Sequence, residues 1–133
     1  MMESLSSEQH ELLLGLFKQI NTAIDELREW NKGVSCANEY LCSSEGMRDL
    51  AASSMLLEAI CEGIKRIDKT TKGELLPLRP EIPWKQVKGM RDNIAHGYFD
   101  IDAELIYTTI KEDLPDLKVA VEWFIRSLET RLL

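Results

Sequence analysis

The sequence has no long hydrophobic run, three cysteines and only two histidines, and each shortage excludes a class of protein. No apolar run approaches the roughly 20 residues that a membrane-spanning helix needs, so we expect no membrane segment and no membrane partner. The first residues, MMESLSSEQHE, are polar and acidic, unlike a secretory signal. We therefore expect a cytoplasmic protein.

The cysteines Cys36, Cys42 and Cys61 are odd in number and form no paired framework. They are typical of reduced thiols in a cytosolic protein. Cys36 and Cys42 lack the spacing of a zinc-binding pair, and His10 and His96 are not spaced with them as further ligands. We expect no metal site and no cofactor.

Basic residues are too few for a protein that coats nucleic acid. The formal net charge is −7, whereas non-specific binding to nucleic acid is driven by neutralising phosphates. This balance does not exclude a local basic cleft. Any chemistry on RNA would therefore have to rest on a confined site.

The composition is that of one ordinary globular domain, which we expect to span residues 1–133. The chain is 44% hydrophobic and 29% charged, with no internal repeat, low-complexity tract or linker. No segment alternates convincingly with a period of two, so strand content should be near zero. Apolar residues recur instead at three- and four-residue steps, which predicts helices.

The first helix is predicted over residues 7–31. Ser6 with Gln9 resembles a capping box, and Gly33 is a plausible stop. Its expected apolar face is Leu12, Leu13, Leu16, Phe17, Ile20, Ile24, Leu27 and Trp30. The segment GVSCANEYLCSSEG that follows lacks a sustained helical period and is predicted to be a loop with at most a short turn.

A second helix should begin near Ser43 or Ser44. Its predicted apolar face is Met47, Leu50, Ala51, Met55, Ala59, Ile60, Ile64 and Ile67. After a connection rich in proline, a third helix is expected from Pro83 or Trp84 to His96 or Gly97. A fourth should run to about Glu112, and Pro115 suits the first turn of the last one. We predict an all-α, antiparallel bundle of four to five helices.

The third predicted helix carries a polar strip beside its apolar face. At 100° per residue, Trp84, Val87, Met90 and Ile94 fall within an arc of about 120°. Arg91 lies at the edge of this arc; Asp92, and His96 if the helix continues that far, lie beyond it. Gly89 falls beside His96, and a helical glycine costs about 1 kcal/mol relative to alanine. Close approach of a second helix, from a second copy of the chain, is one explanation for Gly89; an isolated glycine has several others.

Arg91 and His96 are the residue types that metal-free cleavage of RNA requires. Histidine titrates near neutrality and moves protons, and the arginine fork suits phosphate. Together they would supply a base for the ribose 2′-hydroxyl and a cation for the charge on the pentacovalent phosphate. The alternative is structural: Arg91 pairs with Asp92 or another surface acid, and His96 caps a helix end.

The motif R91-D-N-I-A-H96-G-Y98 resembles the Arg-x4-His-x-Tyr signature of HEPN proteins, specifically the HepT-like group of bacterial and archaeal toxins. The likeness extends over about residues 41–120. It includes EIPWKQVKGMRDNIAHGYFDID, with Trp84 and Gly89, the segment LIYTTIKEDLPDLK, and LCSSEGMRDLAASSMLLEAICEGIKRI.

The resemblance implies a homodimeric all-α bundle with a seam near Gly89. It also implies a metal-independent endoribonuclease in which Arg91 and His96 of both copies line a shared cleft. His96 would transfer protons at the 2′-hydroxyl or the leaving 5′ oxygen, and Arg91 would hold the scissile phosphate. Asp92 and Asn93 would support the site, although Asp92 stands where many relatives carry Asn. The products would be a 2′,3′-cyclic phosphate and a 5′-hydroxyl.

Tyr98 has two interpretations. It could be an aromatic that packs after the helix end with a wet hydroxyl. In the HepT-like group, the equivalent tyrosine receives AMP from a cognate MntA-type nucleotidyltransferase, which acts as the antitoxin. The resemblance therefore implies Tyr98 as the AMP acceptor, where an anionic adenylate would block RNA by bulk and by charge.

Three functions follow from these patterns. One is the ribonuclease toxin of a toxin–antitoxin pair. A second is a nucleotide-binding or scaffold subunit that partners a nucleotidyltransferase without cleaving RNA, which Asp92 and the acidic balance favour. A third, a plain helical oligomerisation domain, leaves the cluster at residues 90–100 unexplained.

Overall fold

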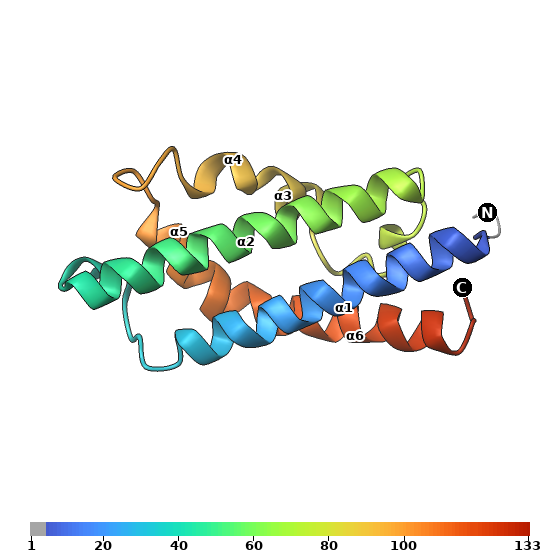
Figure 1. The fold of residues 1–133 in the computed structure, drawn as a ribbon, viewed down its shortest axis with the longest axis horizontal. Helices are drawn as coiled ribbons and strands as arrows, with labels where there is room; N and C mark the ends of the chain where they lie inside the picture. The colour runs from blue at the N-terminus through green and yellow to red at the C-terminus, as the bar shows by residue number, and fades with distance from the viewer. Residues whose placement is uncertain (1–4) are drawn as a thin grey trace.

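A computed structural model describes residues 5–133 as an antiparallel helical bundle (Figure 1). Residues 1–4, the start of the polar segment from which we expected no secretory signal, lie outside the described residues. The long helices are α1 (Ser7–Trp30), α2 (Ser44–Thr70) and α6 (Leu114–Glu129). Within the described part of the chain, no helix is long and apolar enough to cross a bilayer.

Short elements connect the long helices. They are the 3-10 helices η1 (Ala37–Leu41) and η2 (Leu76–Leu78), the α-helices α3 (Trp84–Gly89), α4 (Arg91–Ile94) and α5 (Ala103–Thr108), and the π-helix η3 (Thr109–Asp113). In residues 5–133 the only β pairing is one bridge between Ala95 and Ile101. The all-α prediction is confirmed.

The start of α1 follows the predicted capping box. The Ser6 hydroxyl accepts from the Gln9 amide at 3.1 Å, and the Gln9 side chain accepts from the Ser6 amide at 3.0 Å. The first helix also contacts the last one: His10 Nε2 lies 2.6 Å from the Leu128 carbonyl oxygen. This buried contact joins the first turns of α1 to the last turns of α6, so His10 has a structural role.

The core lies between α1, α2 and α6. Phe17 and Phe124 stack in it with ring centroids 4.8 Å apart. The face predicted for α2 is partly wrong, because Met55 is 74% exposed and the helix instead buries Ser53 and Leu57. Ser53 is tolerated inside because its hydroxyl accepts a hydrogen bond from the buried Asn31 side chain at 2.9 Å.

The third predicted helix is wrong in its length. It breaks at Met90 into α3 and α4 and ends at Ile94, two or three residues before the predicted end at His96 or Gly97. Ala95 is extended (φ −160°, ψ 147°) because it pairs with Ile101, and His96 therefore lies in a loop. The helical-wheel position expected for His96 does not apply. Ile94 is buried as predicted.

The last two predicted helices are continuous through η3. Pro115 has no amide hydrogen to donate to the carbonyl four residues earlier, and the helix accommodates it with a wider turn. The Leu114 amide accordingly donates to the carbonyl of Thr109, five residues back. This turn faces α3 across the site described next.

Candidate active site

The loop after α4 is short and closed by backbone hydrogen bonds. The His96 amide donates to the Asp100 carbonyl at 3.0 Å, and the Asp102 amide donates to the Ile94 carbonyl at 2.9 Å. Gly97 adopts φ +127°, a left-handed conformation that L side chains rarely adopt. The loop thereby holds His96, Tyr98 and Phe99 outside the bundle, where solvent and ligands can reach them.

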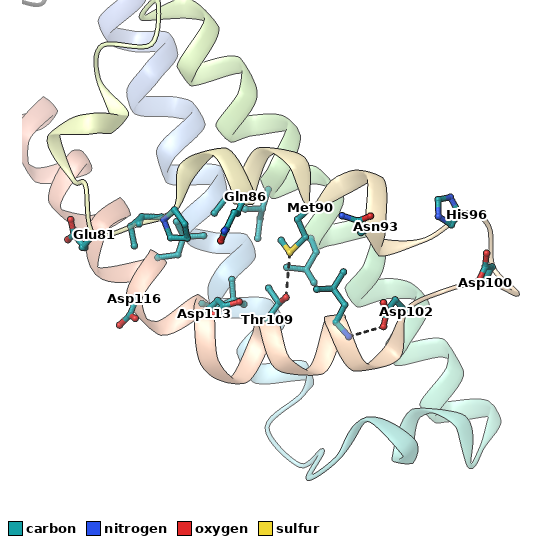
Figure 2. Close-up of a pocket in the computed structure, with 18 residues that line it drawn as sticks. Glu81, Gln86, Met90, Asn93, His96, Asp100, Asp102, Thr109, Asp113 and Asp116 are labelled. Atoms are coloured by element: carbon teal, nitrogen blue, oxygen red, sulfur yellow. Dashed lines mark hydrogen bonds between the residues drawn. The ribbon is translucent and has the colours of Figure 1, made fainter.

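His96 lines one end of a cavity of about 710 Å³ (Figure 2). The cavity lies between α3 and the α5–η3–α6 segment, and its apolar lining includes Val87 of α3 and Leu57 and Ile60 of α2. Thr109 and Met90 meet across it, with the threonine hydroxyl 3.5 Å from the methionine sulfur. Among the described residues, the imidazole of His96 has no hydrogen-bond partner, so both ring nitrogens are free to exchange protons with a ligand.

Carboxylates surround this cavity. They are Glu81, Asp100, Asp102, Asp113 and Asp116. Burial first, and then the neighbouring charges of Glu112 and Asp116, raises the pKa of Asp113. A phosphate in this cavity would meet acids on its rim, so the cation that neutralises it has to come from elsewhere.

Arg91 is the predicted cation, but it does not line the His96 cavity. Its Nε lies 2.9 Å from Oε1 of Glu62 on α2, and the two side chains are 46% and 55% exposed. The structural alternative for Arg91, pairing with a surface acid, is therefore realised in the single chain, with Glu62 rather than Asp92. One chain alone does not bring the arginine and the histidine into one cavity.

The two supporting candidates lie on different sides of α4. Asn93 shares the cavity with His96. Asp92 lines a second, shallow hollow together with Gly89 and four lysines. A side-chain carbon built on Gly89 would meet no atom within 4 Å. No packing inside the single chain therefore requires a glycine there.

Tyr98 is half exposed and Phe99 is 97% exposed. Their rings meet edge to face with centroids 5.2 Å apart, and among residues 5–133 the Tyr98 hydroxyl has no hydrogen-bond partner. The tyrosine is therefore accessible to a modifying enzyme. Sequence reasoning did not identify Glu62 as the partner of Arg91, because no local spacing links two residues that lie on different helices.

Comparisons with known proteins agree on one family. The profile of the ribonuclease HepT-like family matches residues 20–123. A probable ribonuclease HepT of Thermococcus cleftensis is 35% identical over 101 residues, which is 76% of this chain and 84% of the relative.

Other relatives match over shorter stretches. A protein of Methanocaldococcus jannaschii named as a candidate RNase is 36% identical over 56% of this chain and 61% of its own length. A similarly named protein of Caldanaerobacter subterraneus is 35% identical over 50% of this chain and 55% of its own length. No solved structure gives a significant match. The family profile and the long alignment together show that this chain belongs to the HepT-like family of ribonucleases.

Proposed function

We propose that the protein is a metal-independent endoribonuclease, the toxin of a bacterial or archaeal toxin–antitoxin pair acting in the cytoplasm. The observation that carries the proposal is the position of the Arg91-x4-His96 motif in a member of a ribonuclease family. The motif occupies an exposed helix end and a closed loop, with an unpartnered imidazole at the mouth of a cavity.

The chemistry would follow from the two side chains. His96 removes the proton from a ribose 2′-hydroxyl, and the oxygen attacks the adjacent phosphorus. The phosphorus–5′-oxygen bond breaks, and the leaving oxygen takes a proton from a histidine. Arg91 stabilises the negative charge on the phosphate during the transfer. The products are a 2′,3′-cyclic phosphate and a 5′-hydroxyl.

We place this chemistry in a cleft between two copies of the chain. The arginine pairs with Glu62 outside the cavity that His96 lines, so a second copy would complete the set of groups around one phosphate. The open space in front of Gly89 is the proposed seam, because another backbone could approach closely there. Two His96 side chains could then act as base and acid, or one could do both in turn.

Tyr98 is the proposed switch. A cognate MntA-type nucleotidyltransferase would transfer AMP to its free hydroxyl. The adenylate would lie two residues from His96 and add bulk and negative charge at the entrance that RNA must use. The single tyrosine would thus connect the toxin to its antitoxin.

The test is cleavage of a mixed RNA pool in EDTA by protein shown by mass to carry no AMP. We expect cleavage that leaves cyclic phosphate ends, and none by His96→Ala with an unchanged melting temperature. Equal cleavage by His96→Ala would sink the assignment of the histidine. No cleavage by the unmodified wild type would sink the ribonuclease proposal.

A second candidate function is a nucleotide-binding or scaffold subunit for a nucleotidyltransferase. It is favoured by the Arg91–Glu62 pair, which neutralises the phosphate-binding cation, and by Asp92 beside it. In that case AMP modification or complex formation would persist in a protein that never cleaves RNA. The same cleavage assay separates the two functions.

A further inference from the structure

The positive charge of this acidic chain is concentrated in one segment. Eight of the 16 Lys and Arg residues lie in residues 62–91, against four of the 23 Asp and Glu residues. That segment therefore carries +4, whereas the rest of the chain carries −11. Such an asymmetry marks a local surface for an anionic ligand on a protein that otherwise repels one.

The fold brings four of these cations around one hollow. Lys65 and Lys69 are one helical turn apart on α2, and Lys85 and Lys88 are nearly one turn apart on α3. All four line the shallow hollow whose wall includes Gly89. Because Gly89 also marks the proposed seam between two copies, the hollow borders that seam.

The lysines are not all used by intramolecular ion pairs. Lys88 Nζ lies 2.5 Å from Asp68 and is held there, and Lys65 lies 3.8 Å from Glu62. Among the described residues, Lys69 and Lys85 are exposed and have no carboxylate within ion-pair distance. Four lysines and two carboxylates, Asp68 and Asp92, line the hollow, so its formal net charge is +2, and a bound polyanion would neutralise that excess.

We propose that this lysine hollow, formed by Lys65, Lys69, Lys85 and Lys88, binds the sugar-phosphate backbone of RNA. This inference rests on the proposed function. Gly89 and Asp92 both line the hollow, and Arg91 stands between them in the sequence. A strand bound in the hollow would therefore pass directly to Arg91, the proposed site of the scissile phosphate. Lysines hold phosphates as flexible point charges, which suits binding without sequence preference.

A dimer with its seam near Gly89 would place two such hollows beside the seam. The eight lysines of the two copies would then lie on the two sides of one open cleft. They would not be buried in the protein–protein contact, because burial would leave their positive charges unneutralised. RNA lying in the cleft would be held from both sides.

The test measures binding, so that it does not depend on cleavage. The probe is a single-stranded, 2′-O-methylated RNA, which cannot react through its 2′ oxygen. The variant is the triple Lys65→Gln, Lys69→Gln, Lys85→Gln, which spares the Lys88–Asp68 pair. The matched control is Lys18→Gln, Lys32→Gln, Arg48→Gln, which removes the same charge from exposed positions elsewhere. Glutamine preserves helix propensity at the helical positions of both sets, and Lys32 lies in the turn after α1.

The salt dependence of the affinity gives the decisive number. Each phosphate contact on a single strand contributes about −0.7 to the slope of log affinity against log salt concentration, so the triple variant should lose about 2 from that slope. The control should keep the wild-type slope. Asp92→Asn, which removes a carboxylate from the hollow, should bind several-fold more tightly than wild type.

Slopes and affinities that are equal in the triple variant and the control would overturn the hollow as an RNA site. Loss of dimerisation with unchanged RNA binding would also overturn it and make the hollow a protein contact. The proposed function fails separately: wild type that binds through these lysines but leaves unmethylated RNA intact would retain the hollow and refute the nuclease.

Discussion

The guanidinium Nε of Arg91 on α4 lies 2.9 Å from the carboxylate of Glu62 on α2. Both side chains are about half exposed, so the pair contributes at most about 1 kcal/mol to stability. In the proposed mechanism its larger effect is on function, because the arginine would have to exchange this carboxylate for a phosphate before it could stabilise the cleavage reaction.

Removal of that competitor should raise activity. We expect Glu62→Gln to increase kcat/KM for RNA cleavage several-fold without a large change in melting temperature. The control is Glu29→Gln, which breaks the exposed pair with Lys32 and changes the net charge equally. A fall in kcat/KM would instead mean that Glu62 orients the arginine for catalysis.

Gly89→Ala separates the single chain from the dimer. Inside one chain nothing lies within 4 Å of the added methyl group, so the free energy of unfolding should rise by up to about 1 kcal/mol. The dimer dissociation constant should rise at the same time, because the methyl group would obstruct a crossing helix. Gly15→Ala on α1, with equally open space, should stabilise the chain and leave dimerisation unchanged. A dimer that is equally tight in both variants would remove Gly89 from the seam.

Tyr98→Phe should uncouple the protein from its proposed antitoxin. Because the hydroxyl has no partner among the described residues, its loss should change neither stability nor RNA cleavage. Incubation with the cognate nucleotidyltransferase and ATP should add AMP to wild type but not to this variant, as read by intact mass. Tyr107→Phe is the control. The Tyr107 hydroxyl already donates to the Ser35 carbonyl at 2.7 Å, so this variant should still receive AMP, as wild type does. AMP on the Tyr98→Phe protein would assign the modification to another residue.

A buried polar cluster joins α1, η1 and α2. The Asn31 side chain donates to the Ser53 hydroxyl and accepts from the Tyr40 hydroxyl at 2.7 Å. Asn31→Ala would leave buried polar groups unpaired, and we expect it to lower the free energy of unfolding by about 2–4 kcal/mol in denaturant titrations. Asn21→Ala, which removes a more exposed contact to Lys118, should cost less than about 1 kcal/mol. Equal decreases in the free energy of unfolding would show that the buried cluster stabilises the fold no more than the exposed contact does.

The same cluster predicts an alkaline limit to stability. Burial, followed by the charge of Asp49, raises the pKa of Tyr40 to about 12 from its ordinary 10.0. A pKa that is higher in the folded state means a contribution to stability that is complete below pH 10 and lost as the pH rises toward 12. Tyrosinate absorbance should show one of the three tyrosines titrating late. Late titration that persists in Tyr40→Phe would contradict the assignment.

Sequence patterns predicted well where the cause was local. The capping box at Ser6 and Gln9 gave the start of α1 because both hydrogen bonds lie within one turn. The same reasoning failed at Met55, whose spacing suited a core face but which the bundle leaves exposed. Periodicity did not predict that Ser53 is buried instead. The cost of burying its hydroxyl is removed by a hydrogen bond from Asn31, which lies outside α2 and gives no local signal.

For the candidate site, too, local sequence predicted some features and missed those that depend on tertiary contacts. The spacing of Arg91, His96 and Tyr98 fixed which residue types occur together at the end of the third helical segment. It did not fix where they face: a bridge from Ala95 to Ile101 moved His96 off the helix, and Asp92 and Asn93 lie in different hollows. The pairing of Arg91 with Glu62 joins residues far apart in sequence and has no local signal.

By itself, then, the sequence determined an all-α chain, most of its helix boundaries and the set of residue types that stand together at residues 91–98, because capping, periodicity and motif spacing act over a few residues. Only the tertiary structure decided which side chains share a cavity, which acid holds the arginine and that four lysines from two helices surround one hollow. These relationships depend on how α2 packs against α3 and α4, and that packing is set by the buried core of the whole bundle.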